Sequence, residues 1–488
     1  MTVSYKRTVG CIISNIILCT LAVPLQAQQT GAVSLQTIID SAKVHLPVLA
    51  QKRALINSAD AQTKFIRHSF LLSATVADEL SVNTDNSLPG SYWSLGIIPS
   101  TSGGIRPANN YQPATGNVGV LYSQYDLEDF GFKKAAVQNA EANKNLSVTD
   151  LAREEYSLKW QIAQLYFTLV KNQYQLEVDS ENVKRYEDVY KVIQAVTLSG
   201  IKAGADSSLA LAELSKTRTT YNQTLGQVKQ LQQQLAYLSG IPAQNISLST
   251  DTLLSGNNTG DKIINDVQGK LRQLASPPLG PPVPERTGDR GITSPLTDYY
   301  QKQKELYLSA ENLVSKSYLP RIFLAGDLWV RGSSIDANNN YKPLAAGLGY
   351  QRMNYMAGVT ITYDLFNSLH KKDKLAVARY QTQASDEALQ QEQLNLQNIS
   401  NKADEGIKTA YSNLQEIPVQ IKAAQDSYNQ KTAQYKAGII NLIDLTNASY
   451  VLYRSQTDYV QTLSDWYLAN IDKVAATGNL DTFIQSIK

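Results

Sequence analysis

The chain has 488 residues, and its 45 Lys and Arg almost balance its 43 Asp and Glu. Electrostatic binding to nucleic acid needs a basic excess, so this balance makes it a poor candidate for such binding. The only cysteines, Cys11 and Cys19, lie in the first 27 residues, and the three histidines (His45, His68 and His370) are far apart. Past residue 27 there is no thiol for a disulfide, a metal or catalysis, and a His-rich metal site is disfavoured.

Residues 1–27 have the features of a secretory signal peptide. Lys6 and Arg7 precede an apolar run from Val9 to Val23, and Ala27 is a small residue suited to cleavage. The run of about 15 residues is shorter than the roughly 20 that a membrane-spanning helix needs. No later apolar run reaches 18 residues. We therefore expect an exported protein that enters a membrane, if at all, as a β-barrel.

The segment from Phe132 to Gly240 has no proline and predicts two long antiparallel helices. Its apolar residues recur every seven positions, which is the period of a coiled-coil interface. They are Ile162, Leu169, Leu176, Val183 and Tyr190, followed by Leu214, Tyr221, Val228 and Leu235. A helix over 133–198 would be roughly 100 Å long, too long for a compact domain. Glycines at 200 and 204 predict the turn between the two helices.

Four segments alternate with a period of two residues, as β-strands do. They lie near 72–83, 117–125, 321–331 and 353–365, and the loops between them cover 84–116 and 335–352. Val118, Val120 and Tyr122 share one face of the second strand, and Asp78 interrupts the apolar face of the first. Strands of about ten residues with one apolar face fit an outer-membrane barrel, although a soluble sandwich strand would look similar.

The chain also carries an internal repeat. Three landmarks of the first half return in the same order in the second. They are Ser-x-Leu at 69–71 and 317–319, Tyr-Asp-Leu at 125–127 and 363–365, and Lys-Ala-Gly at 202–204 and 436–438. The predicted units are repeats at 28–240 and 298–478, separated by a linker at 241–297 with seven of the 16 prolines and followed by a tail at 479–488. A duplication of this size is informative about the fold itself.

The sequence resembles the TolC-type outer-membrane efflux factor family over nearly all of the expected mature chain. The most specific match is the stretch from Tyr435 to Ala448, which fits the family's Gly-x5-Asp-hydrophobic-x-x-Ala motif. Weaker matches are Leu46-Pro47, Tyr166-Phe167, Leu319-Pro320 and both Tyr-Asp-Leu tripeptides. The resemblance implies a mainly α, internally duplicated fold with a transmembrane β part. Three chains with four strands each would form a 12-stranded β-barrel, continued by a long α-helical coiled-coil periplasmic tunnel.

The implied function is an outer-membrane exit duct of a tripartite efflux or type I secretion system. Its partners would be a periplasmic adaptor, an inner-membrane pump and outer-membrane lipid, with no cofactor. The alternative is an exported coiled-coil envelope protein that does not conduct, although a tether needs no strands. A general porin is contradicted by the long helices. No P-loop, GxSxG, HExxH or Rossmann motif is present, so we expect no enzyme.

The resemblance also assigns site residues near the second glycine turn. Asp444 and Asn447 would line the periplasmic constriction, Tyr435 would help to hold it shut, and Gly204 and Gly438 would form the hairpin turns near the adaptor. For Asp444 the alternative is a helix N-cap, for which Asp is a favoured residue. Both glycines are expected to adopt the left-handed conformation common at helix ends.

Two positions depart from the family pattern. Ile440 and Ala210 stand where a basic and an acidic residue help to lock the tip in the best-known pattern. Either apolar packing replaces that lock here, or the resting tip is looser. Trp93, Trp329 and Tyr355 fit an aromatic girdle at the membrane edge, and ordinary packing would explain them equally well.

Overall fold

The computed structural model describes residues 33–88, 104–199, 204–246 and 294–486. In chain order the elements are α1 (Leu35–His45), α2 (Pro47–His68), β1 (Ser73–Asn83), β2 (Ala114–Glu128), α3 (Phe132–Leu198), α4 (Gly204–Ser239), η1 (Ala243–Asn245), α6 (Pro295–Ser317), β3 (Arg321–Ser333), η2 (Leu344–Gly347), β4 (Arg352–Thr362), α7 (Asn367–Lys436), α8 (Leu442–Ala476) and α9 (Leu480–Ser486). The expected signal peptide at 1–27, Trp93, positions 200–203 and most of the linker at 241–297 lie outside the described residues.

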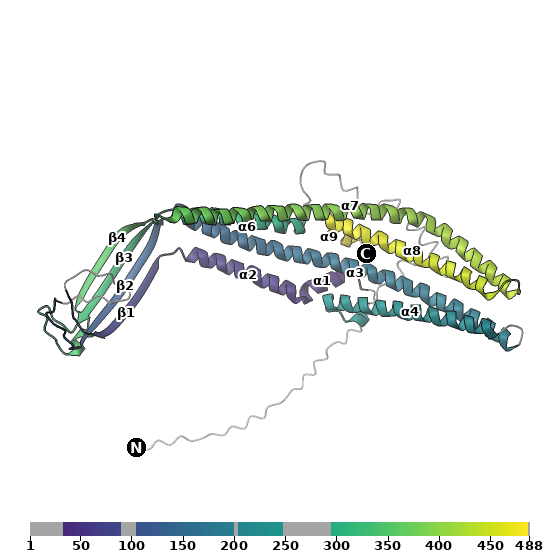
Figure 1. Cartoon of the computed structure of the whole chain (residues 1–488), viewed down its shortest axis with the longest axis horizontal. Helices are drawn as coiled ribbons and strands as arrows, with labels where there is room; N and C mark the ends of the chain where they lie inside the picture. Colours follow the sequence, from purple (N-terminus) through teal and green to yellow (C-terminus); the bar gives the residue numbers. More distant parts are fainter. Residues whose placement is uncertain (1–32, 89–103, 200–203, 247–293, 487–488) are drawn as a thin grey trace, which may run out of the picture.

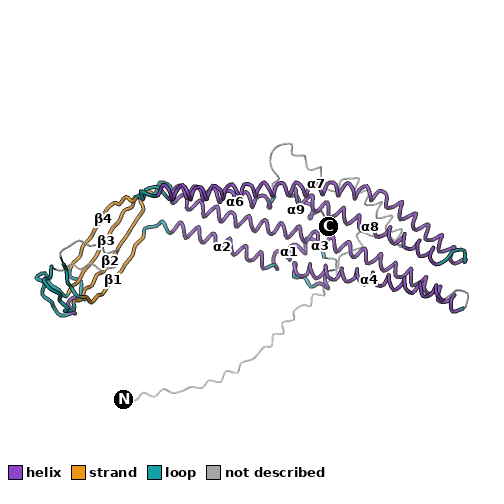
Figure 2. Tube along the Cα trace, viewed as in Figure 1, coloured by secondary structure: helices purple, strands orange, loops and turns teal. Residues whose placement is uncertain are grey.

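The molecule is long and narrow, with the sheet at one end and helices along the rest (Figures 1 and 2). The hairpins α3–α4 and α7–α8 run side by side and end together, away from the sheet (Figure 1). The 67 residues of α3 correspond to a length of roughly 100 Å. None of the described helices combines the length and the apolar character needed to cross a membrane.

The sheet is antiparallel with the order β1-β2-β3-β4, so that β1 and β4 are its free edges within the described part of the chain. Val76, Leu121 and Leu328 are paired across three strands, and Leu328 faces Tyr355 on the fourth. Because paired residues share a face, these side chains form one continuous apolar face. Val118, Val120 and Tyr122 pair with Arg331, Trp329 and Asp327, so they lie on the opposite, more polar face.

Asp78, the exception on the apolar face, has a partner. The Tyr350 hydroxyl donates to its Oδ1 atom at 3.0 Å. Tyr350 reaches it over Gly119, the residue paired with Asp78, where an added Cβ would lie 3.0 Å from the tyrosine oxygen. The small residue on β2 therefore makes room for the side chain that satisfies the carboxylate on β1.

The two Tyr-Asp-Leu tripeptides differ in structure. The strand predicted near 353–365 was expected to include the second tripeptide, but it ends before it. The first lies inside β2, which runs to Glu128 with a register irregularity between Asp126 and Glu128. The second follows β4, which ends at Thr362 opposite Arg321. The next position on β3 would be Pro320, which has no N–H to donate, and no described strand lies on the other side of β4.

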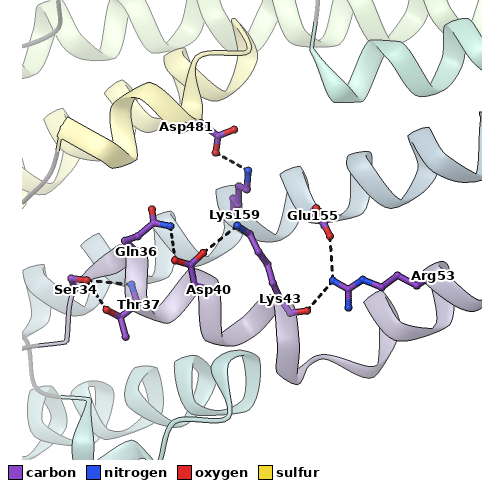
Figure 3. A network of polar contacts seen from close by, with 9 residues as sticks. All are labelled: Ser34, Gln36, Thr37, Asp40, Lys43, Arg53, Glu155, Lys159 and Asp481. Carbon is purple, nitrogen blue, oxygen red and sulfur yellow. Dashed lines mark hydrogen bonds and ion pairs between the residues drawn. The ribbon is translucent and has the colours of Figure 1, made fainter.

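Both ends of the described chain pack against the middle of α3 (Figure 3). The Lys159 ammonium of α3 donates to Asp481 of α9 at 2.6 Å, and Arg53 of α2 donates to Glu155 of α3 at 3.4 Å. In α1, a hydrogen bond from Gln36 and then the charge of Lys43 lower the pKa of Asp40. The largest apolar cluster lies here and includes Ile38, Leu49, Ile162, Leu235, Ile471 and Leu480.

Two helices lie at or across the predicted boundaries of the second repeat. Helix α6 begins at Pro295, inside the expected linker, because Ser294 and Thr297 form a capping box ahead of the repeat boundary at 298. The expected tail at 479–488 contains α9, whose Leu480, Phe483 and Ile484 are buried in the large cluster. Apolar packing therefore orders residues that the sequence alone leaves without a partner.

Candidate functional site: the hairpin tips

The turn between α7 and α8 is closed by a Schellman motif. The Gly438 N–H donates to the Tyr435 carbonyl at 3.0 Å, and the Ile439 N–H donates to the Gln434 carbonyl at 2.9 Å. Gly438 has φ +73°, and no atom lies within 4 Å of where its Cβ would be. Glycine is required here by the left-handed backbone, as predicted, and not by lack of space.

Gly204 differs from this prediction. It is the first residue of α4, and its φ does not lie in the positive range. Residues 200–203 lie outside the described residues. Gly204 itself does not supply a left-handed residue for this turn. The two Lys-Ala-Gly landmarks are therefore equivalent in sequence but not in backbone conformation.

Asp444 is not the N-cap of α8. That position is held by Asn441, whose side-chain oxygen accepts from the Asp444 N–H at 2.9 Å. The Asp444 side chain is exposed, and so is Asn447 one turn later, whereas Leu442, Leu445 and Ala448 are buried. Residues three apart share a helix face, so the carboxylate and the amide form one polar edge opposite the packed side. The N-cap alternative for Asp444 is wrong.

Tyr435 lies half-buried at the end of α7, against the apolar cluster of the tips. Burial raises the pKa of its phenol, and the nearby negative charge of Asp206 in the first turn of α4 raises it further. The ring thus remains neutral and connects the end of one hairpin to the start of α4.

The tips are held together by apolar packing. Ile193 of α3, Ala210 of α4 and Leu442 of α8 form one cluster and are 0%, 1% and 2% exposed. Ala210 is one of the two positions where the family's charged lock is missing, and Ile440, the other, is half-buried. Of the two alternatives left open by the sequence, this arrangement favours apolar packing in place of the lock.

A buried polar cluster lies farther from the tips and was missed by sequence reasoning. Asp179 of α3 is 1% exposed and accepts from Thr224 of α4 at 2.6 Å, Tyr453 of α8 at 2.9 Å and Gln175 at 2.8 Å. Burial and the neighbouring carboxylate raise the pKa of Tyr453 to about 12. Asp179 lies three residues after Leu176, at the second core position of the heptad repeat. A charged residue at a core position was the signal in the sequence that could have indicated this cluster.

Arg185 forms a second polar contact between the hairpins, nearer the tips. Its guanidinium donates to Asn182 on the same helix and to Gln456 of α8, each at 3.2 Å. Gln456 is 1% exposed, and burial lowers the pKa of the arginine. Buried polar groups need partners, so these contacts fix one relative position of α3 and α8.

A four-stranded sheet with two free edges that continues into two long helical hairpins, built from two repeats of one unit, is the protomer architecture of an outer-membrane export channel. The chain belongs to the outer membrane efflux protein family, whose model matches residues 38–241 and 308–479. The predicted family and fold class are thereby confirmed. The protein is an outer-membrane exit channel with its helical part in the periplasm, and its family is one of channels and not of enzymes.

Solved structures share the fold. The outer membrane protein VceC from Vibrio cholerae is 13% identical with a TM-score of 0.69, and the match covers 91% of this chain and 96% of that one. The CmeC outer membrane channel of Campylobacter jejuni is 14% identical, with a TM-score of 0.62 and coverages of 93% and 89%. The open-state MtrE outer membrane channel of Neisseria gonorrhoeae is 16% identical, with a TM-score of 0.65 and coverages of 91% and 89%. No curated protein matches the chain in sequence at a significant level.

Proposed function

We propose that three copies of the chain form the exit duct of a tripartite efflux or type I secretion system. The observation that supports the assembly is the open sheet, in which β1 and β4 have no partner on their outer sides among the described residues. Unpaired backbone groups are very costly in lipid, so each free edge needs a strand from another chain. Three protomers with four strands each give a closed 12-stranded barrel, an even number within the known range.

The proposed constriction is the polar edge formed by Asp444 and Asn447. Threefold symmetry would turn one exposed carboxylate into a ring of three, which attracts cations. Asp444 also lies in the first turn of α8, next to the turn that joins the two long helices. Tyr435 and the cluster of Ile193, Ala210 and Leu442 would hold this ring in place. This proposal is supported by the exposure of Asp444 and Asn447 along one edge of α8, beside the buried apolar side chains of the same helix.

The turns at Gly204 and Gly438 would lie near the docking surface for a periplasmic adaptor. Leu198 before the first turn is 83% exposed and Ile439 within the second is 72% exposed. Exposed apolar side chains at both tips suit a partner that buries them. An inner-membrane pump, reached through the adaptor, would supply the energy, so transport through the duct itself would be passive.

The test is conductance in planar bilayers, with and without divalent cations. The wild-type channel should be cation-selective and blocked by divalents, and Asp444→Asn should weaken both properties. The matched control is Asp188→Asn, which removes the same charge from a carboxylate of α3 that is 79% exposed. Selectivity and block that are unchanged in Asp444→Asn, or weakened equally by the control, would remove the constriction from this residue.

A further inference from the structure

The two β-hairpins of the chain have the same register, residue for residue. In the first hairpin Ser73 pairs with Gln124, and in the second Arg321 pairs with Thr362. The offsets are 248 on the first strand and 238 on the second. They equal the sequence offsets of the Ser-x-Leu and Tyr-Asp-Leu landmarks, at 69 and 317 and at 125 and 363. The repeat in sequence is therefore also a repeat in strand pairing.

The chain contains one example of how consecutive hairpins join, which is the pairing of β2 with β3. There, Tyr122 faces Asp327 and Leu121 faces Leu328. The offset of 238 converts each β2 residue of such a pair into its equivalent on β4. Subtracting 248 converts each β3 residue into its equivalent on β1, which gives the equivalent pairing of β4 with β1. We propose that β4 binds β1 of the next copy in this register, with Thr360 opposite Glu79 of the partner subunit and Val359 opposite Leu80 of the partner subunit. This inference rests on the proposed trimeric assembly and adds its register.

The distribution of side chains supports the register independently of the repeat. Val359 lies on the apolar face with Tyr355, and Leu80 lies on the apolar face of β1 with Val76. The proposed pairing joins these two faces across the subunit boundary. A slip by one residue would set Val359 opposite Glu79. The apolar side chains of one copy would then share a side of the sheet with the polar side chains of the next copy, which is strongly disfavoured where one side is buried.

The register also accounts for the different ends of β2 and β4. Tyr125 and Asp126 are paired with Leu324 and Phe323 of β3, whereas the equivalent Tyr363 and Asp364 have no strand partner. In the assembly Tyr363 would lie opposite Val76 of the partner subunit, and β4 would lengthen by these two residues. Tyr363 is 55% exposed in the single chain, which leaves it available for this contact.

Cysteine cross-linking of the full-length protein in outer membranes tests the register. The matched pairs are Thr360→Cys with Glu79→Cys and Val359→Cys with Leu80→Cys, one on each face, so one of them occupies the closer, non-hydrogen-bonded type of site. The mismatched control is Thr362→Cys with Glu79→Cys, displaced by two residues on the same face. Directly opposed Cα atoms lie about 4.5–5.5 Å apart, and diagonal ones about 7–8 Å, beyond the reach of an unstrained disulfide.

The matched pairs should yield covalent dimers and trimers under mild oxidation, at least about tenfold faster than the mismatched pair, because only they satisfy disulfide geometry. Single-cysteine variants control for the native Cys11 and Cys19. Faster linkage of the mismatched pair, or no linkage of either matched pair in membranes that contain the trimer, would overturn the register. The trimer is scored separately with an amine-reactive cross-linker. Its absence would instead refute the proposed assembly.

Discussion

The contact between the hairpin tips offers the sharpest test of the proposal that these tips close the channel. Ala210 of α4 is 1% exposed and packs with Ile193 of α3 and Leu442 of α8. Ala210→Asp would place a carboxyl group inside this apolar cluster, at the position where the family's charged lock has its acid. Because the surrounding side chains are apolar, the ionised form would be strongly destabilised while the tips stay together.

The size of the effect follows from the pKa of the new carboxyl. Keeping it protonated at pH 7 costs about 1.4 kcal/mol for each pH unit above its ordinary pKa of about 3.9, or roughly 4 kcal/mol in all. The opposing packing of two fully buried aliphatic side chains, Ile193 and Leu442, is worth about 1.5–3 kcal/mol each. The cost of keeping the carboxyl protonated is therefore comparable to the free energy gained from this packing. A cost of about 4 kcal/mol corresponds to a rise of up to about a thousandfold in the ratio of separated to packed tips at pH 7.

The sign with respect to pH is fixed. The packed state raises the pKa of the new carboxyl, so protonation favours the packed state as pH falls, and ionisation favours separation as pH rises. Single-channel recordings from about pH 4.5 to 8 should show conductance or open time increasing with pH for Ala210→Asp. Ala210→Asn, of nearly the same shape but without a titratable group, should lack the added pH dependence. If both variants show the same pH profile, the tip contact does not control the pore.

Two further predictions concern backbone and buried polar groups. Gly438→Ala should destabilise the protein by about 1–2 kcal/mol because the φ of Gly438 is +73°. Gly204→Ala, at the start of α4, should be neutral or stabilising. Equal thermal midpoints for the two variants would contradict the difference in backbone conformation. Tyr453→Phe removes one of the donors to buried Asp179 and should cost about 1.5–3 kcal/mol, whereas Tyr450→Phe, 56% exposed on the same helix, should change stability by less than about 0.5 kcal/mol. Since the pKa of Tyr453 is about 12, above the ordinary value near 10, its contribution should be constant below about pH 10 and lost between there and pH 12, which urea unfolding at several pH values would show.

Much of the fold follows from periodicity. The seven-residue spacing through Ile162 and Leu169 predicted the long helix α3, and both residues are fully buried. The two-residue alternation located the strands, and the repeat predicted the equivalence of the two halves. These features are written directly in the spacing of apolar residues, which is why one sequence without relatives is sufficient for them.

The details that sequence reasoning missed depend on which of several possible partners each residue contacts. The cap of α8 went to Asn441 because its side chain reaches the Asp444 N–H, and both residue types are good caps. The face of Val118 on β2 was decided by its pairing with Arg331, not by its own hydrophobicity. The end of β4 is set by Pro320 on the neighbouring strand. In each case the sequence permitted several solutions, and one specific contact selected among them.

The docking of α9 has a consequence for the order in which the protein matures. Lys159 contacts Asp481, and the Tyr156 hydroxyl donates to the Ala475 carbonyl at 2.8 Å, so the middle of α3 is completed by residues more than 300 positions later. When the chain is made from its N-terminus, α3 is therefore present long before the last residues of its cluster. Products shortened before Leu480 should be less stable, because the large apolar cluster then lacks Leu480, Phe483 and Ile484.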